Sequence, residues 1–156
     1  MKDLRATGER RTVSIEVEAP PEDVYAFVTS VEKLGALGPE CERCEWVEPG
    51  VHFRGHNRVG DFTWSTDCFV VADEPGRRFA YEVGEPRYVR WTYELAPAAS
   101  GTRLAHSFEI LHLSPIYEHV PVDHLPMRWA ALEDGMRAVL AGVKREVEAA
   151  RDAQPA

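Results

Sequence analysis

Apolar and polar residues alternate along much of the chain, and each alternating stretch is short. Between Arg11 and Glu18 the apolar residues occupy every second position, which is typical of a half-buried β-strand. Six more such segments follow before residue 110, separated by turns that contain glycine or proline. This pattern predicts a meander of seven antiparallel strands. The expected strands are Arg11–Glu18, Glu45–Glu48, Val51–Val59, Phe62–Ala72, Arg78–Val83, Tyr88–Leu95 and Thr102–Ile110.

Helical spacing replaces the alternation in two parts of the chain. After the first strand, Pro21 suits the opening turn of a helix, apolar residues recur at helical spacing, and Gly35 ends the region. We expect two short helices there. A longer helix is predicted from about Asp123 to Ala150, where the apolar residues form one stripe that only the sheet can cover. That stripe consists of Trp129, Leu132, Met136, Val139, Leu140, Val143 and Val147.

The length and composition fit a single α+β domain. With 156 residues, of which 44% are hydrophobic and 28% charged, the chain can bury one sizeable core. We expect this domain to span residues 11–150, between a polar N-terminal tail (1–10) and a frayed C-terminal tail (151–156). No apolar run approaches the roughly 18 residues that a membrane span needs, and the first ten residues do not resemble a signal segment. The sequence therefore predicts a cytoplasmic protein.

The charge balance argues against nucleic acid as the main partner. Acidic residues outnumber basic ones by 26 to 18, which gives a net charge of -8, and a phosphate-binding groove needs the opposite sign. A small neutral or apolar ligand fits this composition better. The sequence leaves the oligomeric state, monomer or homodimer, open.

Several short pieces of the sequence carry a family resemblance. They are Pro49–Arg58 (PGVHFRGHNR), Trp64, Glu74–Phe79 (EPGRRF), Ala19–Val28 (APPEDVYAFV), Trp91–Leu95 (WTYEL) and Gly101–Leu104 (GTRL). Together they resemble the polyketide cyclase/dehydrase branch of the START-like (SRPBCC) superfamily. The resemblance implies a helix-grip fold, in which a seven-stranded curved antiparallel sheet wraps around a long C-terminal helix and leaves a deep ligand cavity. It says less about the reaction, because that superfamily includes aromatase/cyclases of secondary metabolism, lipid carriers and hormone receptors.

Strand alternation also selects the residues that we expect to face this cavity. If Phe53 points inward, residues two positions apart along each strand share its face. The resulting wall is rich in Trp, Tyr and Phe, which suits flat aromatic ligands. The alternative is that these rings simply form the core. The predicted ligand-binding residues are Phe53, Asn57, Trp64, Thr66, Phe79, Trp91, Phe108, Tyr117, Trp129 and Met136.

Three polar residues of the same face suit catalysis: His106, Tyr81 and Tyr93. An imidazole ordinarily titrates near neutral pH, so His106 is the candidate general acid and base. A phenol hydroxyl from Tyr81 or Tyr93 would polarise a carbonyl group and stabilise an enolate. The alternative for His106 is a histidine that is hydrogen-bonded within the sheet.

Metal and redox chemistry receive little support from the sequence. His112, His119 and His124 lie in the long connection before the last helix, a candidate lid, but their spacing matches no standard zinc motif. Cys41 and Cys44 form a single C-x-x-C outside any parallel βαβ pattern, so a zinc or redox role stays open. We therefore expect neither a metal nor another cofactor.

Alternate residues of the Val51–Val59 strand form a basic stripe on the face opposite the cavity. It is interpreted as a solvated surface, and the alternative is docking of an acidic acyl carrier protein. Gly135 and Gly142 flank the apolar stripe of the long helix, where missing side chains would widen the cavity or permit close packing. The basic stripe consists of His52, Arg54, His56 and Arg58.

The leading hypothesis is a cofactor-independent enzyme that binds an aromatic or polyketide-type molecule and promotes its cyclisation, aromatisation or dehydration. Most of the catalysis would come from folding the substrate against the wall, with acid/base help from His106 and a tyrosine. The rival is a non-catalytic carrier or sensor of a hydrophobic small molecule. A third possibility is a structural partner whose cavity is filled by its own rings. A cavity of at least roughly 300 Å³ that reaches solvent beside His106 would favour the first two, and a filled interior would favour the third.

Overall fold

The computed structural model describes residues 8–113 and 120–153 of the chain. Within these residues, seven strands form one sheet, accompanied by three α-helices and a short 3-10 helix. The strands are β1 (Arg10–Val17), β2 (Cys41–Glu48), β3 (His52–Val59), β4 (Phe62–Glu74), β5 (Arg78–Val83), β6 (Val89–Ala98) and β7 (Gly101–Ile110). The helices are α1 (Pro21–Val28), α2 (Val31–Gly35), the 3-10 helix η3 (Val122–His124) and α3 (Leu125–Asp152).

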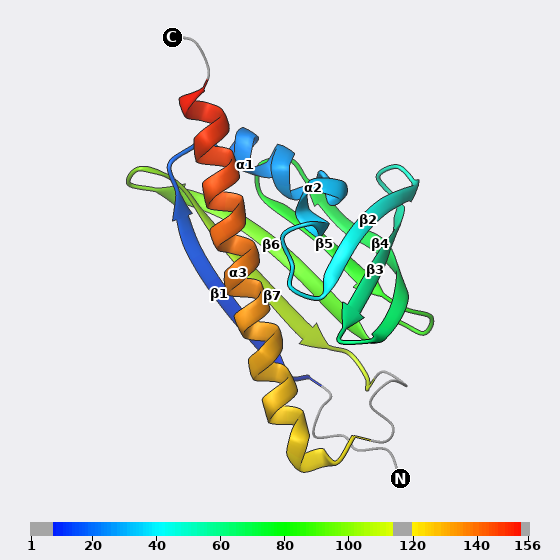
Figure 1. Ribbon diagram of the computed structural model, residues 1–156. Helices are drawn as coiled ribbons and strands as arrows, with labels where there is room; N and C mark the ends of the chain where they lie inside the picture. Colours follow the sequence, from blue (N-terminus) through cyan, green and yellow to red (C-terminus); the bar gives the residue numbers. More distant parts are fainter. Residues whose placement is uncertain (1–7, 114–119, 154–156) are drawn as a thin grey trace.

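The sheet is antiparallel throughout, with the strand order β1-β7-β6-β5-β4-β3-β2. The first strand therefore pairs with the last one, and the other strands follow as a meander. The sheet curves around α3, which runs along its concave side next to β1 and β7 (Figure 1). Helices α1 and α2 cover the same side, with α1 beside the C-terminal half of α3 (Figure 1). The predicted helix-grip fold is confirmed.

The C-terminal half of α3 is attached to β1 by polar contacts. The Lys144 ammonium group donates a hydrogen bond to the Glu16 carbonyl oxygen (2.9 Å), and the Glu18 backbone N–H donates one to the Glu148 carboxylate (2.8 Å). That N–H, together with Lys144, lowers the pKa of the Glu148 carboxyl group. Val143 on the same helix is fully buried. The N-terminal half of α3 lies over the remaining part of the concave face (Figure 1).

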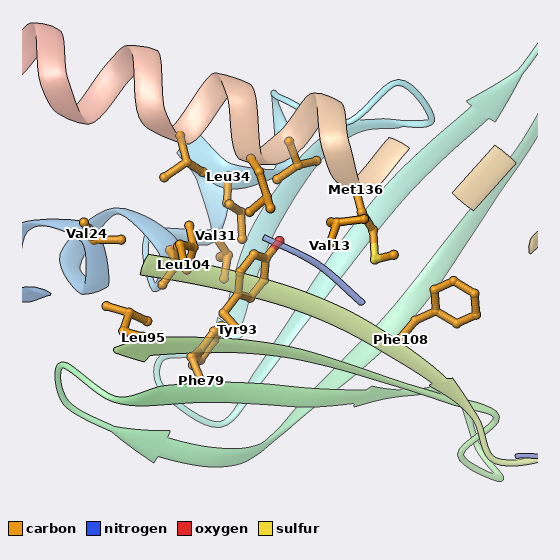
Figure 2. Close-up of a cluster of buried hydrophobic side chains, with 14 of the residues drawn as sticks. Val13, Val24, Val31, Leu34, Phe79, Tyr93, Leu95, Leu104, Phe108 and Met136 are labelled. Atoms are coloured by element: carbon orange, nitrogen blue, oxygen red, sulfur yellow. The ribbon is translucent and has the colours of Figure 1, made fainter. Parts of the chain in front are cut away.

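The hydrophobic core lies where α1, α2 and α3 meet the sheet. Figure 2 shows Val24 of α1, Leu34 of α2 and Leu104 of β7 converging beneath α3, and all three are buried. Tyr25 of α1 belongs to the same core, and its hydroxyl group shares its proton between the Asp73 carboxylate and the carbonyl oxygen of the residue that opens β5. This pair of bonds fixes α1 against the β4–β5 hairpin.

One strand begins well before its predicted position. Strand β2 begins at Cys41 instead of Glu45. Its register explains the difference, because Cys41 pairs with Asn57 while Arg43 pairs with the adjacent residue of β3, so a β-bulge lies between them. A bulge interrupts the two-residue alternation, and the pattern therefore gave no strand signal there. Strand β5, which has no bulge within it, has the predicted bounds.

Candidate ligand-binding cavity

A cavity of about 230 Å³ lies between the concave face of the sheet, α2 and the N-terminal half of α3. Strands β2 to β7 all contribute to its wall. The cavity is smaller than the roughly 300 Å³ that we expected, and the indole rings of Trp64, Trp91 and Trp129 lie in its wall. The interior is nevertheless not completely filled by the protein's own rings.

Most of the residues predicted for the site come together on this wall. Alternation assigned the correct face from β3 to β7, because paired strands bring inward-facing residues into register, as in the Tyr93–His106 pair of β6 and β7. Asn57 lies beside Thr66 across β3 and β4, with a long contact of 3.5 Å between its amide nitrogen and the hydroxyl oxygen. The predicted residues that line the cavity are Phe53, Asn57, Trp64, Thr66, Tyr81, Trp91, Tyr93, His106, Trp129 and Met136.

Two of the predicted ligand-binding residues that the structure describes do not line this wall. Phe79 and Phe108 are 2% and 0% exposed and belong to the core. Phe108 packs beneath the Trp129 ring of α3, with 6.1 Å between ring centres, so the helix covers it. Figure 2 shows these two phenylalanines well apart on the sheet. Tyr117 lies outside the described residues.

The two cavity tyrosines keep their hydroxyl groups protonated. Burial is the main cause that raises the pKa of Tyr81 and of Tyr93 above the ordinary value. The structure gives neither hydroxyl a hydrogen bond to another described residue. Figure 2 shows the Tyr93 ring standing up from the sheet, with its oxygen directed toward α3. Both phenols are therefore neutral donors that a ligand oxygen can accept from.

His106 is buried and has no hydrogen-bond partner among the described residues. It is 3% exposed, and both ring nitrogens are inaccessible. Its imidazole stacks on the Tyr93 ring at 3.9 Å between ring centres, and Trp91 lies 5.4 Å away on the same side of the sheet. Burial lowers the pKa of His106 to about 3. The expected pKa near neutrality does not apply, because among the described residues no neighbouring charge or hydrogen bond stabilises the imidazolium.

An ion pair that the sequence gave no reason to expect forms part of the cavity wall. The Arg128 guanidinium of α3 holds the Glu40 carboxylate through both of its terminal nitrogens, with 2.8 Å between Nη2 and Oε1. The two residues are 88 positions apart in the chain. No local spacing connects residues so distant, and only the fold brings them together. The pair links the N-terminal half of α3 to the segment that precedes β2.

The histidines and cysteines of the described residues do not assemble a metal site. No group of three or more His, Cys, Asp or Glu side chains with metal-binding geometry occurs in the described part of the chain. His112 lines the cavity beside Tyr88, with 6.4 Å between ring centres, whereas His124 is exposed at the start of α3. His119 lies outside the described residues.

The basic stripe on the outer face of β3 is neutralised by acidic neighbours. Each of its four residues contacts a carboxylate of an adjacent strand, so the stripe offers no uncompensated positive charge to an acidic partner. The pairs are His52–Asp67 at 2.9 Å, Arg54–Asp67 at 3.1 Å, His56–Glu45 at 2.7 Å and Arg58–Glu42 at 2.6 Å. Docking of an acyl carrier protein stays a prediction that this surface does not favour.

The two glycines of α3 have different surroundings. A methyl group at Gly142 would lie 2.9 Å from a Leu37 methyl carbon, so this glycine permits close packing. A methyl group at Gly135 would meet the Pro39 ring at 3.4 Å, which is an ordinary contact, and Gly135 lines the cavity.

None of the described helices, α3 included, is both long and apolar enough to cross a lipid bilayer.

The fold and the cavity define a class of protein: a helix-grip domain with a ligand cavity between sheet and terminal helix. The family model described as polyketide cyclase / dehydrase and lipid transport matches residues 9–148. The chain therefore belongs to that family. Among proteins with curated functional descriptions, none matches the sequence.

Solved structures show the same arrangement. A polyketide cyclase-like protein from Corynebacterium glutamicum is 30% identical, with a TM-score of 0.62, and the match covers 89% of this chain and 91% of that one. The Zhui aromatase/cyclase from Streptomyces sp. R1128 is 20% identical, with a TM-score of 0.71 and coverage of 90% and 93%. A START superfamily protein from Mycobacterium smegmatis is 15% identical, with a TM-score of 0.71 and coverage of 90% and 98%. The last two support the fold alone.

Proposed function

We propose that this protein binds a compact, flat, hydrophobic molecule of aromatic or polyketide type in the cavity and promotes its cyclisation, aromatisation or dehydration. The observation that carries the proposal is the set of neutral polar groups left unpaired on an otherwise apolar wall. Tyr81 and Tyr93 offer hydroxyl groups without partners among the described residues. Buried polar groups normally have partners, so a ligand bearing oxygen atoms is the natural one.

The size of the cavity restricts the ligand. A volume of about 230 Å³ lies below the roughly 300–1,000 Å³ of pockets that hold drug-sized molecules. A long flexible chain does not fit such a space in an extended form. The three indole rings of the wall favour a planar guest, because aromatic rings pack best against flat apolar faces.

The chemistry supported by these groups is positioning and neutral hydrogen bonding. A phenol of Tyr81 or Tyr93 would donate to a ketone oxygen and stabilise the enolate that forms while a new carbon–carbon bond closes a ring. Holding the substrate folded against the wall supplies the remaining rate enhancement. His106 has a lesser part in this scheme than the sequence suggested, because a base works best when its pKa lies near the working pH.

The second candidate is a carrier or sensor that leaves its ligand unaltered. The pKa of about 3 for His106 favours it, since an imidazole that stays neutral is a poor proton donor near pH 7. The family description also names lipid transport beside cyclase and dehydrase activity. The two candidates share the cavity and the ligand class, and they differ in whether the ligand is changed.

A pair of aromatic probes tests the binding role of the hydroxyls. We expect 2-naphthol and naphthalene to quench the fluorescence of the cavity tryptophans. Tyr93→Phe and Tyr81→Phe should weaken 2-naphthol binding by about 2-fold to 10-fold, the value of one hydrogen bond. Naphthalene affinity should hardly change, because this probe has no oxygen. Tyr25→Phe, a matched substitution outside the cavity, should affect neither probe.

If a tyrosine variant loses affinity for 2-naphthol and for naphthalene equally, the tyrosines act only through packing. The proposed hydrogen bond to the ligand would then be wrong. Native mass spectrometry of the purified protein separates the two candidates, by identifying a co-purified small molecule. If that molecule is released unchanged after incubation, and an open-chain precursor is not converted by the protein, the carrier is the correct choice. If the protein converts the precursor and Tyr93→Phe lowers the rate of that conversion, the enzyme is the correct choice.

A further inference from the structure

All three cysteines of the chain lie on the wall of the candidate ligand-binding cavity. Cys41 and Cys44 belong to β2, and Cys68 belongs to β4. The sulfur atoms of Cys41 and Cys44 are 3.4 Å apart, close to contact distance. Both residues are half-buried, whereas Cys68 is buried. The proposed binding function uses none of these thiols.

The bulge in β2 is what brings the two sulfurs together. In a regular strand, residues three positions apart point to opposite faces. Here Cys41 pairs with Asn57 and Cys44 pairs with Gly55, which are two positions apart on β3 and share the cavity face. The extra residue between Cys41 and Arg43 therefore turns both cysteines to the same side. A C-x-x-C on a regular strand would have no such geometry.

Glycines leave room for the pair beneath α2. A methyl group at Gly35 would lie 2.8 Å from the Cys44 sulfur, and one at Gly55 would lie 3.7 Å from it. Any larger residue at Gly35 would push the Cys44 sulfur away from its present place. The dithiol is thus packed between α2 and the sheet, and it still reaches the cavity.

The two thiols differ in acidity. A hydrogen bond from Cys44 lowers the pKa of Cys41, and the same bond, together with burial, raises the pKa of Cys44. Burial raises the pKa of Cys68 to about 12. Because the thiolate is the reactive form, Cys41, the one thiol whose pKa is lowered, is the expected nucleophile.

We propose that Cys41 and Cys44 form a redox-active dithiol in the cavity wall, which a peroxide oxidises to a disulfide and a small thiol reduces again. In the first step the Cys41 sulfur attacks one oxygen of hydrogen peroxide. The oxygen–oxygen bond breaks, a sulfenic acid forms on Cys41, and the departing hydroxide takes up the proton of the former thiol to become water.

In the second step the Cys44 sulfur attacks the sulfenic sulfur. The sulfur–sulfur bond forms, the sulfur–oxygen bond breaks, and the departing hydroxide becomes water with the proton of Cys44. Two thiols have then lost two electrons in total, and one peroxide has become two water molecules. A dithiol such as dithiothreitol restores the reduced pair by thiol–disulfide exchange. The sulfurs have to approach each other only from 3.4 Å to a bonded distance of about 2 Å.

The test is oxidation of the whole protein with hydrogen peroxide, followed by intact-mass measurement without reductant. We expect a loss of about 2 Da that dithiothreitol reverses, and a fall in titratable thiols from three to one. Trypsin cuts between the two cysteines after Arg43, so the disulfide should join peptides 34–43 and 44–54. Cys68→Ser should form the same linkage, which makes it the matched control.

Cys41→Ser and Cys44→Ser should each abolish the mass loss, and the Cys41 variant should also slow the first reaction with peroxide. Circular dichroism would show whether either variant has failed to fold, and the linked peptides of the wild-type protein decide the matter in any case. A disulfide that involves Cys68, a disulfide between two chains, or accumulation of sulfinic acid on Cys41 without a linkage would overturn the proposal. A count of three titratable thiols after the peroxide treatment would also overturn it.

Discussion

The His106→Phe substitution is expected to change how the stability of the protein depends on pH. The imidazole is 3% exposed and has no hydrogen-bond partner among the described residues. In the folded protein its pKa is lowered to about 3 by burial, whereas the unfolded chain exposes it to water, where its pKa has the ordinary value of 6.5. Phenylalanine keeps a flat ring against Tyr93 and has no group to protonate.

The sign and size of the effect follow from proton binding. As the pH falls from 6.5 toward 3, the unfolded chain binds a proton at this position and the folded protein does not, so stability is lost in that window. The loss is about 1.4 kcal/mol per pH unit, which amounts to about 2 kcal/mol at about pH 5 and to almost nothing at about pH 7.5. The variant lacks this loss, because the titrating group is absent from both of its states.

A second contribution is independent of pH. An unpaired buried polar group costs about 1–3 kcal/mol, and the apolar ring removes that cost. The larger phenylalanine ring offsets part of this gain if the packing around it is tight. The difference in stability near pH 7.5 therefore has either sign, and only its change with pH tests the argument.

Urea denaturation of the wild-type protein and of His106→Phe, at several values between about pH 7.5 and about pH 5, measures that change. The variant should gain about 2 kcal/mol over the wild-type protein across this range, since all other titrating groups are common to both and cancel. His106→Leu, with a differently shaped side chain, should give the same pH dependence. A difference that stays constant would mean that the folded protein protonates His106 readily, and the neutral cavity would be refuted.

Three further substitutions test the packing of the helices. Gly135→Ala should raise the free energy of unfolding by about 0.5–1 kcal/mol, because alanine is the better helix former and its methyl group would meet only ordinary contacts. Gly142→Ala should gain less, since its methyl group would displace Leu37, and equal gains in urea denaturation would contradict this. Tyr25→Phe should lower the free energy of unfolding by about 1–2 kcal/mol, because its hydrogen bond to Asp73 is lost; an unchanged urea midpoint would refute this.

The fold could be predicted because its elements have regular periods. A strand with one buried face repeats every two residues, and β5 therefore appears in the sequence with the bounds Arg78–Val83 that the structure gives it. The apolar residues of α3 likewise recur at helical spacing. The strand alternation and this helical spacing together predict seven antiparallel strands and a terminal helix. The bulge that follows Cys41 breaks the period at the start of β2, and the first residues of that strand were therefore not predicted.

The candidate site was predictable only in part. Alternation identifies which face of a strand a residue occupies, and it brought Tyr81, Tyr93 and His106 to the same wall. It does not identify which part of that face borders the cavity, so Phe79 and Phe108 were predicted for a wall that they do not line. The pKa of a histidine is likewise invisible in a sequence, because burial and neighbouring charges determine it.

The cavity persists because α3 is held on both sides of it. Lys144 and Glu148 attach its C-terminal half to β1, and Arg128 attaches its N-terminal half to Glu40. A helix fixed at two places cannot sink toward the sheet to bury the unpaired groups beneath it. The protein's own contacts therefore form the cavity, and the proposed ligand need not reorder the helix to bind. The unfavourable burial of His106 is tolerated because contacts elsewhere in the fold are strong enough to maintain it.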